Sequence, residues 1–255
     1  MAAPLDCLIF EPDKDKFLTG DDFITLYGVG DKWLSVSVID AAVDEIVAQC
    51  ASDKFEYILA SVATRLLDEG CNESDSELKK VLKGKTIILP YNANRSHWLI
   101  LVAGTRTRKL QIYDSLAGNH PEKTEDLMKK LLGFIKSRNQ WSEEKIDAEH
   151  WEWGRSVFES LPQHDSDNCG VFVIYNIYLS LTGKRPRKGQ FNSKLFRKEL
   201  AQIIVRKISS GNRDDSVEAS EKPVEDTFSA LEHSERLSCK NRNDVTLVSD
   251  CTKSH

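Results

Sequence analysis

Two short stretches near the middle of the chain, Trp98–Ala103 and Lys109–Tyr113, are rich in β-branched, aliphatic and aromatic residues. The polar residues 104–108 separate them, which is the pattern of a β-hairpin. This feature constrains the fold most, because two strands joined by a short turn must run antiparallel. We therefore expect the end of the second strand to return to the start of the first.

Helices are predicted on both sides of this hairpin. Apolar residues recur at helical spacing through Trp33–Gln49 and Glu122–Ser137. Other expected helices are Ser61–Leu67, Ser76–Leu82, Gly170–Leu181 and Phe191–Ile208, and other expected strands are Phe55–Leu59, Lys85–Tyr91 and Ser156–Leu161, the last after a Trp-rich connection. Strands gathered mid-chain with helices at both ends indicate an α+β fold.

The composition favours one domain followed by a tail. We expect residues 1–210 to fold and residues 211–255 to be a disordered acidic tail, because that segment is polar and carries ten acidic against six basic residues. A net charge of −5 argues against a strongly basic nucleic-acid binder. The apolar runs fall short of the ~20 residues of a membrane helix, and no signal peptide is visible, so we expect a soluble cytoplasmic or nuclear monomer.

Six cysteines are present without a CxxC pair or a histidine at zinc-ligand spacing. This pattern argues against a structural metal site and a disulfide framework, and no cofactor is expected. Free thiols are therefore predicted, and any of them could act as a nucleophile.

Four short motifs carry candidate chemistry: Ser96-His97-Trp98, Tyr113-Asp114-Ser115, Pro162-Gln163 and Asn168-Cys169-Gly170. Cys169 comes at the start of a predicted helix, whose positive end favours a thiolate, as does a neighbouring imidazolium. Asp167 and Asn168 are good capping types, and Gly170 leaves space for a substrate carbonyl. The acidic side chains of the preceding loop, Asp165 and Asp167, are expected to be solvated.

The hairpin supplies the partner of a thiol nucleophile. Antiparallel pairing brings Asp114 next to His97, where its carboxylate can accept the imidazole N–H and fix the tautomer. Gln163, six positions before the thiol, can donate its amide to a developing oxyanion, with the Cys169 N–H as second donor. His97, Asp114, Gln163 and Cys169 are therefore the candidate catalytic set of a thiol protease.

These motifs resemble the signature of the Ulp/sentrin-specific protease family, papain-like enzymes that process SUMO and related ubiquitin-like modifiers. The resemblance spans about residues 31–208 and implies a central mixed sheet with the nucleophile at the start of a buried helix. It also implies that Trp33 and Trp98 sandwich a Gly-Gly tail, since two indoles leave a slot that only residues without a Cβ can enter. The chain is similar to the short deneddylating branch, which modestly favours a neddylation modifier over SUMO as partner.

Three positions depart from the family's usual residues. Asn168 stands where an Asp usually precedes the nucleophile, Ser35-Val36 replaces Asn-Asp after Trp-Leu, and Arg95-Ser96 replaces small residues before the histidine. These departures leave open a catalytically inactive module that binds ubiquitin-like modifiers. A third alternative is acyl transfer from a thioester to an amine.

Overall fold

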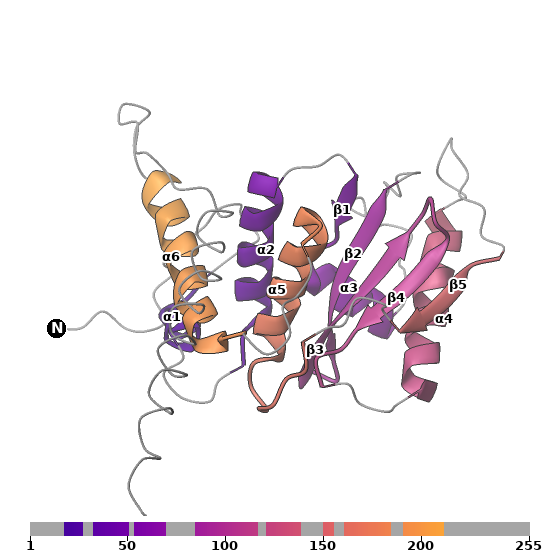
Figure 1. Ribbon diagram of the computed structural model, residues 1–255, viewed down its shortest axis with the longest axis horizontal. Helices are drawn as coiled ribbons and strands as arrows, with labels where there is room; N and C mark the ends of the chain where they lie inside the picture. The colour runs from indigo at the N-terminus through magenta and orange to yellow at the C-terminus, as the bar shows by residue number, and fades with distance from the viewer. Residues whose placement is uncertain are drawn as a thin grey trace, which may run out of the picture.

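A mixed sheet built around the predicted hairpin forms the middle layer of the molecule (Figure 1). The computed structural model describes residues 18–27, 33–50, 54–69, 85–116, 121–138, 150–155, 161–184 and 191–211. Within them the strands, in their order across the sheet, are β1 (Phe55–Tyr57), β2 (Thr86–Ala93), β3 (His97–Gly104), β4 (Lys109–Tyr113) and β5 (Glu152–Arg155). The helices are α1 (Gly20–Leu26), α2 (Val36–Cys50), α3 (Ala60–Glu69), α4 (Pro121–Arg138), α5 (Cys169–Thr182) and α6 (Ser193–Gly211).

The hairpin is confirmed as the antiparallel pair β3–β4. Its register places Gly104 opposite Lys109 and Ile100 opposite Tyr113. β2 also pairs antiparallel with β3, whereas β1 and β5 pair parallel with β2 and β4. The sheet is therefore mixed, and its central strand begins at His97.

The strands bury both faces, and alternate residues of β3 enter two separate apolar cores. Trp98, Ile100 and Val102 join the core formed with α1, α2, α5 and α6, which we call the α5 side. Leu99, Leu101 and Ala103 join the core formed with α3 and α4, which we call the α4 side. Figure 1 shows α1, α2, α5 and α6 gathered on one side of the sheet. The α+β, papain-like arrangement expected from the sequence is confirmed.

Residues 156–160 of the strand expected at Ser156–Leu161 lie outside the described residues, and its last residue, Leu161, is not in a strand. The described strand in this region, β5, is formed by the preceding Glu152–Arg155. The sequence of β5 has no β-branched residue, so its extended form depends on pairing with β4, where the Glu152 N–H also donates to the Arg108 carbonyl at 2.9 Å.

Helix α1 was not expected from the sequence. Its Thr19 accepts a hydrogen bond from the Asp22 N–H, and the Asp22 carboxylate accepts one from the Thr19 N–H, which is a capping box. The helix expected at Ser76–Leu82 lies outside the described residues. The predicted tail also lies outside them, apart from Gly211, which ends α6. Among the described helices, none is long and apolar enough to cross a membrane.

Candidate active site

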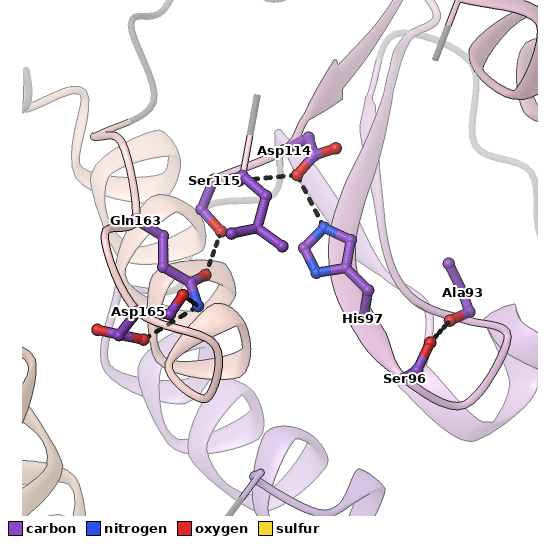
Figure 2. Close-up of polar contacts among 8 residues, drawn as sticks. Ala93, Ser96, His97, Asp114, Ser115, Gln163 and Asp165 are labelled. Carbon is purple, nitrogen blue, oxygen red and sulfur yellow. Dashed lines mark hydrogen bonds and ion pairs between the residues drawn. The ribbon is translucent and has the colours of Figure 1, made fainter. Parts of the chain in front are cut away.

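The ends of the hairpin strands bring His97 and Asp114 into contact. His97 is the first residue of β3, and Asp114 directly follows β4. His97 Nε2 lies 2.8 Å from Asp114 Oδ1, the pair that Figure 2 shows joined by a dashed line. An ionised carboxylate at this distance holds the proton on Nε2, which leaves Nδ1 as the basic nitrogen.

The surroundings of His97 favour its charged form. Burial lowers the pKa of His97, but the hydrogen-bonded Asp114 carboxylate and the neighbouring Cys169 outweigh this effect and raise the pKa to about 9. Nδ1 is buried and makes no hydrogen bond to any atom of the described residues, Cys169 Sγ included. The ring therefore has a carboxylate on one nitrogen, and Cys169 is close enough to influence its pKa without a hydrogen bond to the other nitrogen.

Cys169 is the first residue of α5, as the sequence predicts. The helix runs for 14 residues, and the thiol exposes only 1% of its surface. The N-terminal end of a helix carries a partial positive charge, which suits the position of a nucleophilic thiol. Asn168 occupies the cap position, but its side chain makes no capping hydrogen bond to α5.

Gln163 is buried and linked to the segment that follows Asp114. Its backbone N–H donates to the Ser115 carbonyl at 2.8 Å, and its Oε1 accepts from Ser115 Oγ at 2.8 Å. Its Nε2 donates to the carbonyl of Asp165 at 2.7 Å and to Asp165 Oδ1 at 3.1 Å (Figure 2). The amide proposed as an oxyanion donor is therefore held by its own loop in this structure.

The loop before the nucleophile contains a hydrogen-bond network that the sequence analysis missed. Asp165, expected to be solvated, accepts from the Asn168 side chain at 2.9 Å, and its other oxygen accepts from the N–H groups of Asn168 and Asp167. Arg197 of α6 is buried, and its Nε donates to Asn168 Oδ1 at 2.7 Å. The Asp-x-x-Asn spacing could have indicated the turn, because Asp often accepts N–H groups two and three residues later. No sequence signal pointed to Arg197.

Trp33 lies in the segment before α2, and Trp98 contacts that segment. Trp98 is buried, and its Nε1 donates to the Leu34 carbonyl at 3.0 Å. Trp33 keeps 47% of its surface exposed, while its Nε1 donates to the Ser166 carbonyl at 2.9 Å. Trp33 thus contacts the loop that leads to Cys169.

The structure gives Gly170 a packing role. A Cβ at this position would lie 3.1 Å from Leu34 Cβ, 3.2 Å from Ile39 Cδ1 and 3.3 Å from Trp98 Cδ1. The space expected to admit a substrate carbonyl is bordered by these core side chains, so the glycine allows α5 to lie close to α2 and β3. Among the described residues, no group of three His, Cys, Asp or Glu side chains could hold a metal ion.

The sequence matches a known family over most of this fold. The model of the Ulp1 protease family, C-terminal catalytic domain, matches residues 49–210, which is more than half of the chain. The chain belongs to the Ulp1 protease family. A sequence search among curated proteins gives no significant match.

Solved structures of Ulp1-type proteases share the fold. The C-terminal Ulp1 protease domain in complex with Smt3, the yeast ortholog of SUMO, has a TM-score of 0.66 and 16% identity, covering 81% of this chain and 91% of that one. The Chaetomium thermophilum Ulp1-like SUMO protease catalytic domain has a TM-score of 0.54 and 20% identity, covering 84% and 87%. At these identities the likeness establishes the fold, which is that of Ulp1 proteases.

Two departures from the family's usual residues have structural partners here. Ser35 Oγ accepts from the Val38 N–H at 3.2 Å, which caps α2, and donates to Asp22 Oδ1 at 2.6 Å. Asn168 joins Arg197 to Asp165. Both replacements are therefore integrated into the packing of the α5 side.

Proposed function

We propose that the protein is a thiol peptidase that cleaves after the C-terminal Gly-Gly of a ubiquitin-like modifier, from a precursor or a lysine conjugate. The observation that carries this proposal is the position of His97, bonded to Asp114 at 2.8 Å and interacting with the Cys169 thiol at the start of α5. A thiol, a base and an acid that orients the base are the parts of nucleophilic acyl transfer. Membership of the Ulp1 protease family supports the same chemistry.

The proposed cycle uses His97 twice. His97 takes the proton of Cys169, and the thiolate attacks the carbonyl carbon of the terminal glycine. The Cys169 N–H and the Gln163 amide stabilise the oxyanion. The imidazolium then protonates the leaving amine as the C–N bond breaks, which leaves a thioester. A water molecule, deprotonated by His97, hydrolyses the thioester and releases the modifier and the thiol.

The burial of Cys169 supports a substrate tail without side chains. A thiol that exposes 1% of its surface is reached by a narrow extended segment more readily than by a folded chain. We infer that the tail passes between Trp33 and Trp98, which donate hydrogen bonds to the Ser166 and Leu34 carbonyls. A Gly-Gly terminus meets this requirement because glycine has no Cβ.

The test is covalent capture by a modifier carrying a C-terminal electrophile. We expect the wild-type protein to form a stable adduct with such a probe, and Cys169→Ala to bind without forming one. Cys50→Ala, which removes the other free thiol among the described residues, is the matched control and should label fully. Adduct formation by Cys169→Ala, or its loss in Cys50→Ala, would refute the assignment of the nucleophile.

A second candidate function is a binding module without catalysis. It is favoured by the near-complete burial of the thiol and by the engagement of Gln163 Nε2 with Asp165. In that case the probe would bind tightly and reversibly and leave no adduct on the wild-type protein. A time course on a denaturing gel separates these outcomes directly.

The choice of modifier is a further part of the proposal. SUMO is supported by the similar solved structures, which are SUMO proteases, and a neddylation modifier by the resemblance to the short deneddylating branch. Hydrolysis rates on fluorogenic SUMO, ubiquitin and neddylation-modifier substrates will rank them. Rates within about tenfold of one another would contradict narrow specificity, since that ratio corresponds to only about 1.4 kcal/mol of discrimination.

A further inference from the structure

In the loop before Cys169, the donor and the acceptor of each side-chain hydrogen bond are fixed. The Arg197 guanidinium has only donors, so Asn168 must present its oxygen to Arg197 Nε, at 2.7 Å. The nitrogen of the Asn168 amide then points the other way, and it donates to Asp165 Oδ2 at 2.9 Å. Residue 165 must therefore present an acceptor. A buried cation from α6 thus determines the hydrogen bonding of an exposed loop residue.

Asp165 in turn holds the Gln163 amide. Its carbonyl and its Oδ1 both accept from Gln163 Nε2, at 2.7 and 3.1 Å. The same Oδ1 accepts from the N–H groups of Asp167 at 3.2 Å and Asn168 at 2.9 Å. Partial burial raises the pKa of Asp165, but these hydrogen bonds lower it further, so the net shift is downward. The carboxylate is charged at neutral pH, and its two oxygens serve different partners.

Gln163 is held on its other side by the hairpin. Ser115 Oγ donates to Gln163 Oε1, so the oxygen and the nitrogen of the amide each have a fixed partner. An amide with both ends engaged has one orientation, and an oxyanion donor must be oriented before the reaction. The plane of the Gln163 amide therefore depends on Ser115 and Asp165 together.

We propose that Asp165 and Asn168 are a matched pair of positioning residues that orient the Gln163 amide, with Arg197 setting the direction of the pair. The inference rests on the proposed role of Gln163 as an oxyanion donor. It explains the departure at position 168: the negative charge that the family usually carries directly before the nucleophile is carried here three residues earlier, at position 165.

Each single exchange breaks the pair. Asn168→Asp places a second carboxylate against Asp165 and removes the N–H that it accepts. In Asp165→Asn, one orientation of the new amide directs its N–H toward the side-chain N–H of Asn168. The other orientation loses the side-chain oxygen that accepts from Gln163. The double exchange restores the hydrogen bond between the two side chains, with donor and acceptor exchanged. An amide at position 165 then donates to a carboxylate at position 168, and that carboxylate still accepts from Arg197.

The test is a double-mutant cycle read as kcat and KM on the modifier substrate that the wild-type protein cleaves best. We expect Asn168→Asp and Asp165→Asn each to lower kcat by about tenfold to hundredfold, the effect of misplacing a catalytic group. KM should change little. The double variant should recover to within about threefold of wild-type kcat, which is non-additive coupling between neighbours.

Two controls isolate the pair. Asp167→Asn makes the same charge change closer to the thiol, but its carboxylate accepts from Ser166 Oγ, and its hydrogen bond with Arg197 is made by its backbone carbonyl. It should keep wild-type kcat. Alkylation of Cys169 by iodoacetamide should proceed at the wild-type rate in the double variant, which keeps the wild-type net charge, because the pair acts on Gln163 and not on His97.

The outcomes are distinct. A double variant whose kcat loss equals the product of the two single losses would overturn the proposal, and so would single variants with wild-type kcat. If the wild-type protein cleaves no modifier substrate, the proposed function fails. The coupling between positions 165 and 168 is then measured from urea unfolding midpoints. The midpoint of the double variant should differ from that of wild type by less than the sum of the two single-variant shifts. A difference equal to that sum would overturn the pairing.

Discussion

The two sides of the sheet bury the same strands but differ in what their helices contribute. On the α4 side, α3 and α4 present apolar residues to Leu99 and Leu101 of β3. On the α5 side, every helix also buries a polar residue: of the described helical side chains, the buried polar ones are Asp22 of α1, Asp40 of α2, Asn176 of α5 and Arg197 of α6. Burying such groups is costly unless they are hydrogen-bonded.

Two of these buried groups have identified tasks near the site. Asp22 accepts from Ser35, which caps α2, and Arg197 spans from the Thr25 carbonyl at 2.6 Å to Asn168. Burial lowers the pKa of Arg197, and the nearby acidic groups oppose that effect. The α4 side therefore completes the core, whereas the α5 side also orients the segments around Cys169.

The largest effect on the α5 side is expected from Asp114→Asn. Losing the charge beside His97 should lower kcat/KM by about 10²–10⁴-fold, the contribution of a positioned acid–base group. It should also lower the pKa of His97, so that the alkaline limb of the pH–rate profile moves down from its position near pH 9. Asp126→Asn on α4 makes the same charge change and should leave the profile unchanged. An unchanged profile in Asp114→Asn would contradict the role of the carboxylate.

A pair of leucine truncations compares the two cores directly. Leu131 of α4 and Leu200 of α6 both have 0% exposure, one on each side. Each change to Ala should lower the free energy of unfolding by about 2–5 kcal/mol. At a temperature where both variants are folded, Leu200→Ala should also lower kcat, because α6 carries Arg197, whereas Leu131→Ala should not. Chemical denaturation and steady-state kinetics measure both, and equal kcat values would remove the distinction between the sides.

The same substitution at two glycines should have opposite signs. Gly170→Ala forces a Cβ against Leu34, Ile39 and Trp98, and overpacking of this kind costs about 1–3 kcal/mol. Gly133 lies on α4 with nothing within 4 Å of an added Cβ, so Gly133→Ala should stabilise the helix by about 0.5–1 kcal/mol. Thermal melts of the two variants measure this. A stabilising Gly170→Ala would show that α5 does not lie as close to α2 as described.

The smallest effect is the pH dependence of stability contributed by His97. Its pKa rises from the ordinary 6.5 to about 9 on folding, so the folded state binds the proton more tightly. The resulting stabilisation is complete below pH 6.5 and is lost as the pH rises through about 9. The difference in urea midpoint between wild type and His97→Gln should therefore shrink from pH 6 to pH 10. A difference that grows with pH would contradict the sign.

Much of the fold was predictable because it depends on local patterns. The spacing of apolar residues predicted α2 and α4 within a few residues of their ends. Helix α1 was missed because seven residues are too few to show a clear apolar periodicity. The capping box with Thr19 is what defines its start. Strand β5 was missed because its extended form depends on pairing with β4 and not on its own residues.

The sequence by itself determined the His97–Asp114 pair and the start of α5 at Cys169. A short turn fixes how two strands meet, and an apolar helix after a polar loop fixes where the thiol lies. Only the tertiary structure decided that Asn168 joins Arg197 to Asp165, that Gln163 is held by Asp165 and Ser115, and that Gly170 packs against Leu34. These contacts depend on the direction of each hydrogen bond and on how α6 and α2 pack beside α5. Such information is absent from any single segment of the chain.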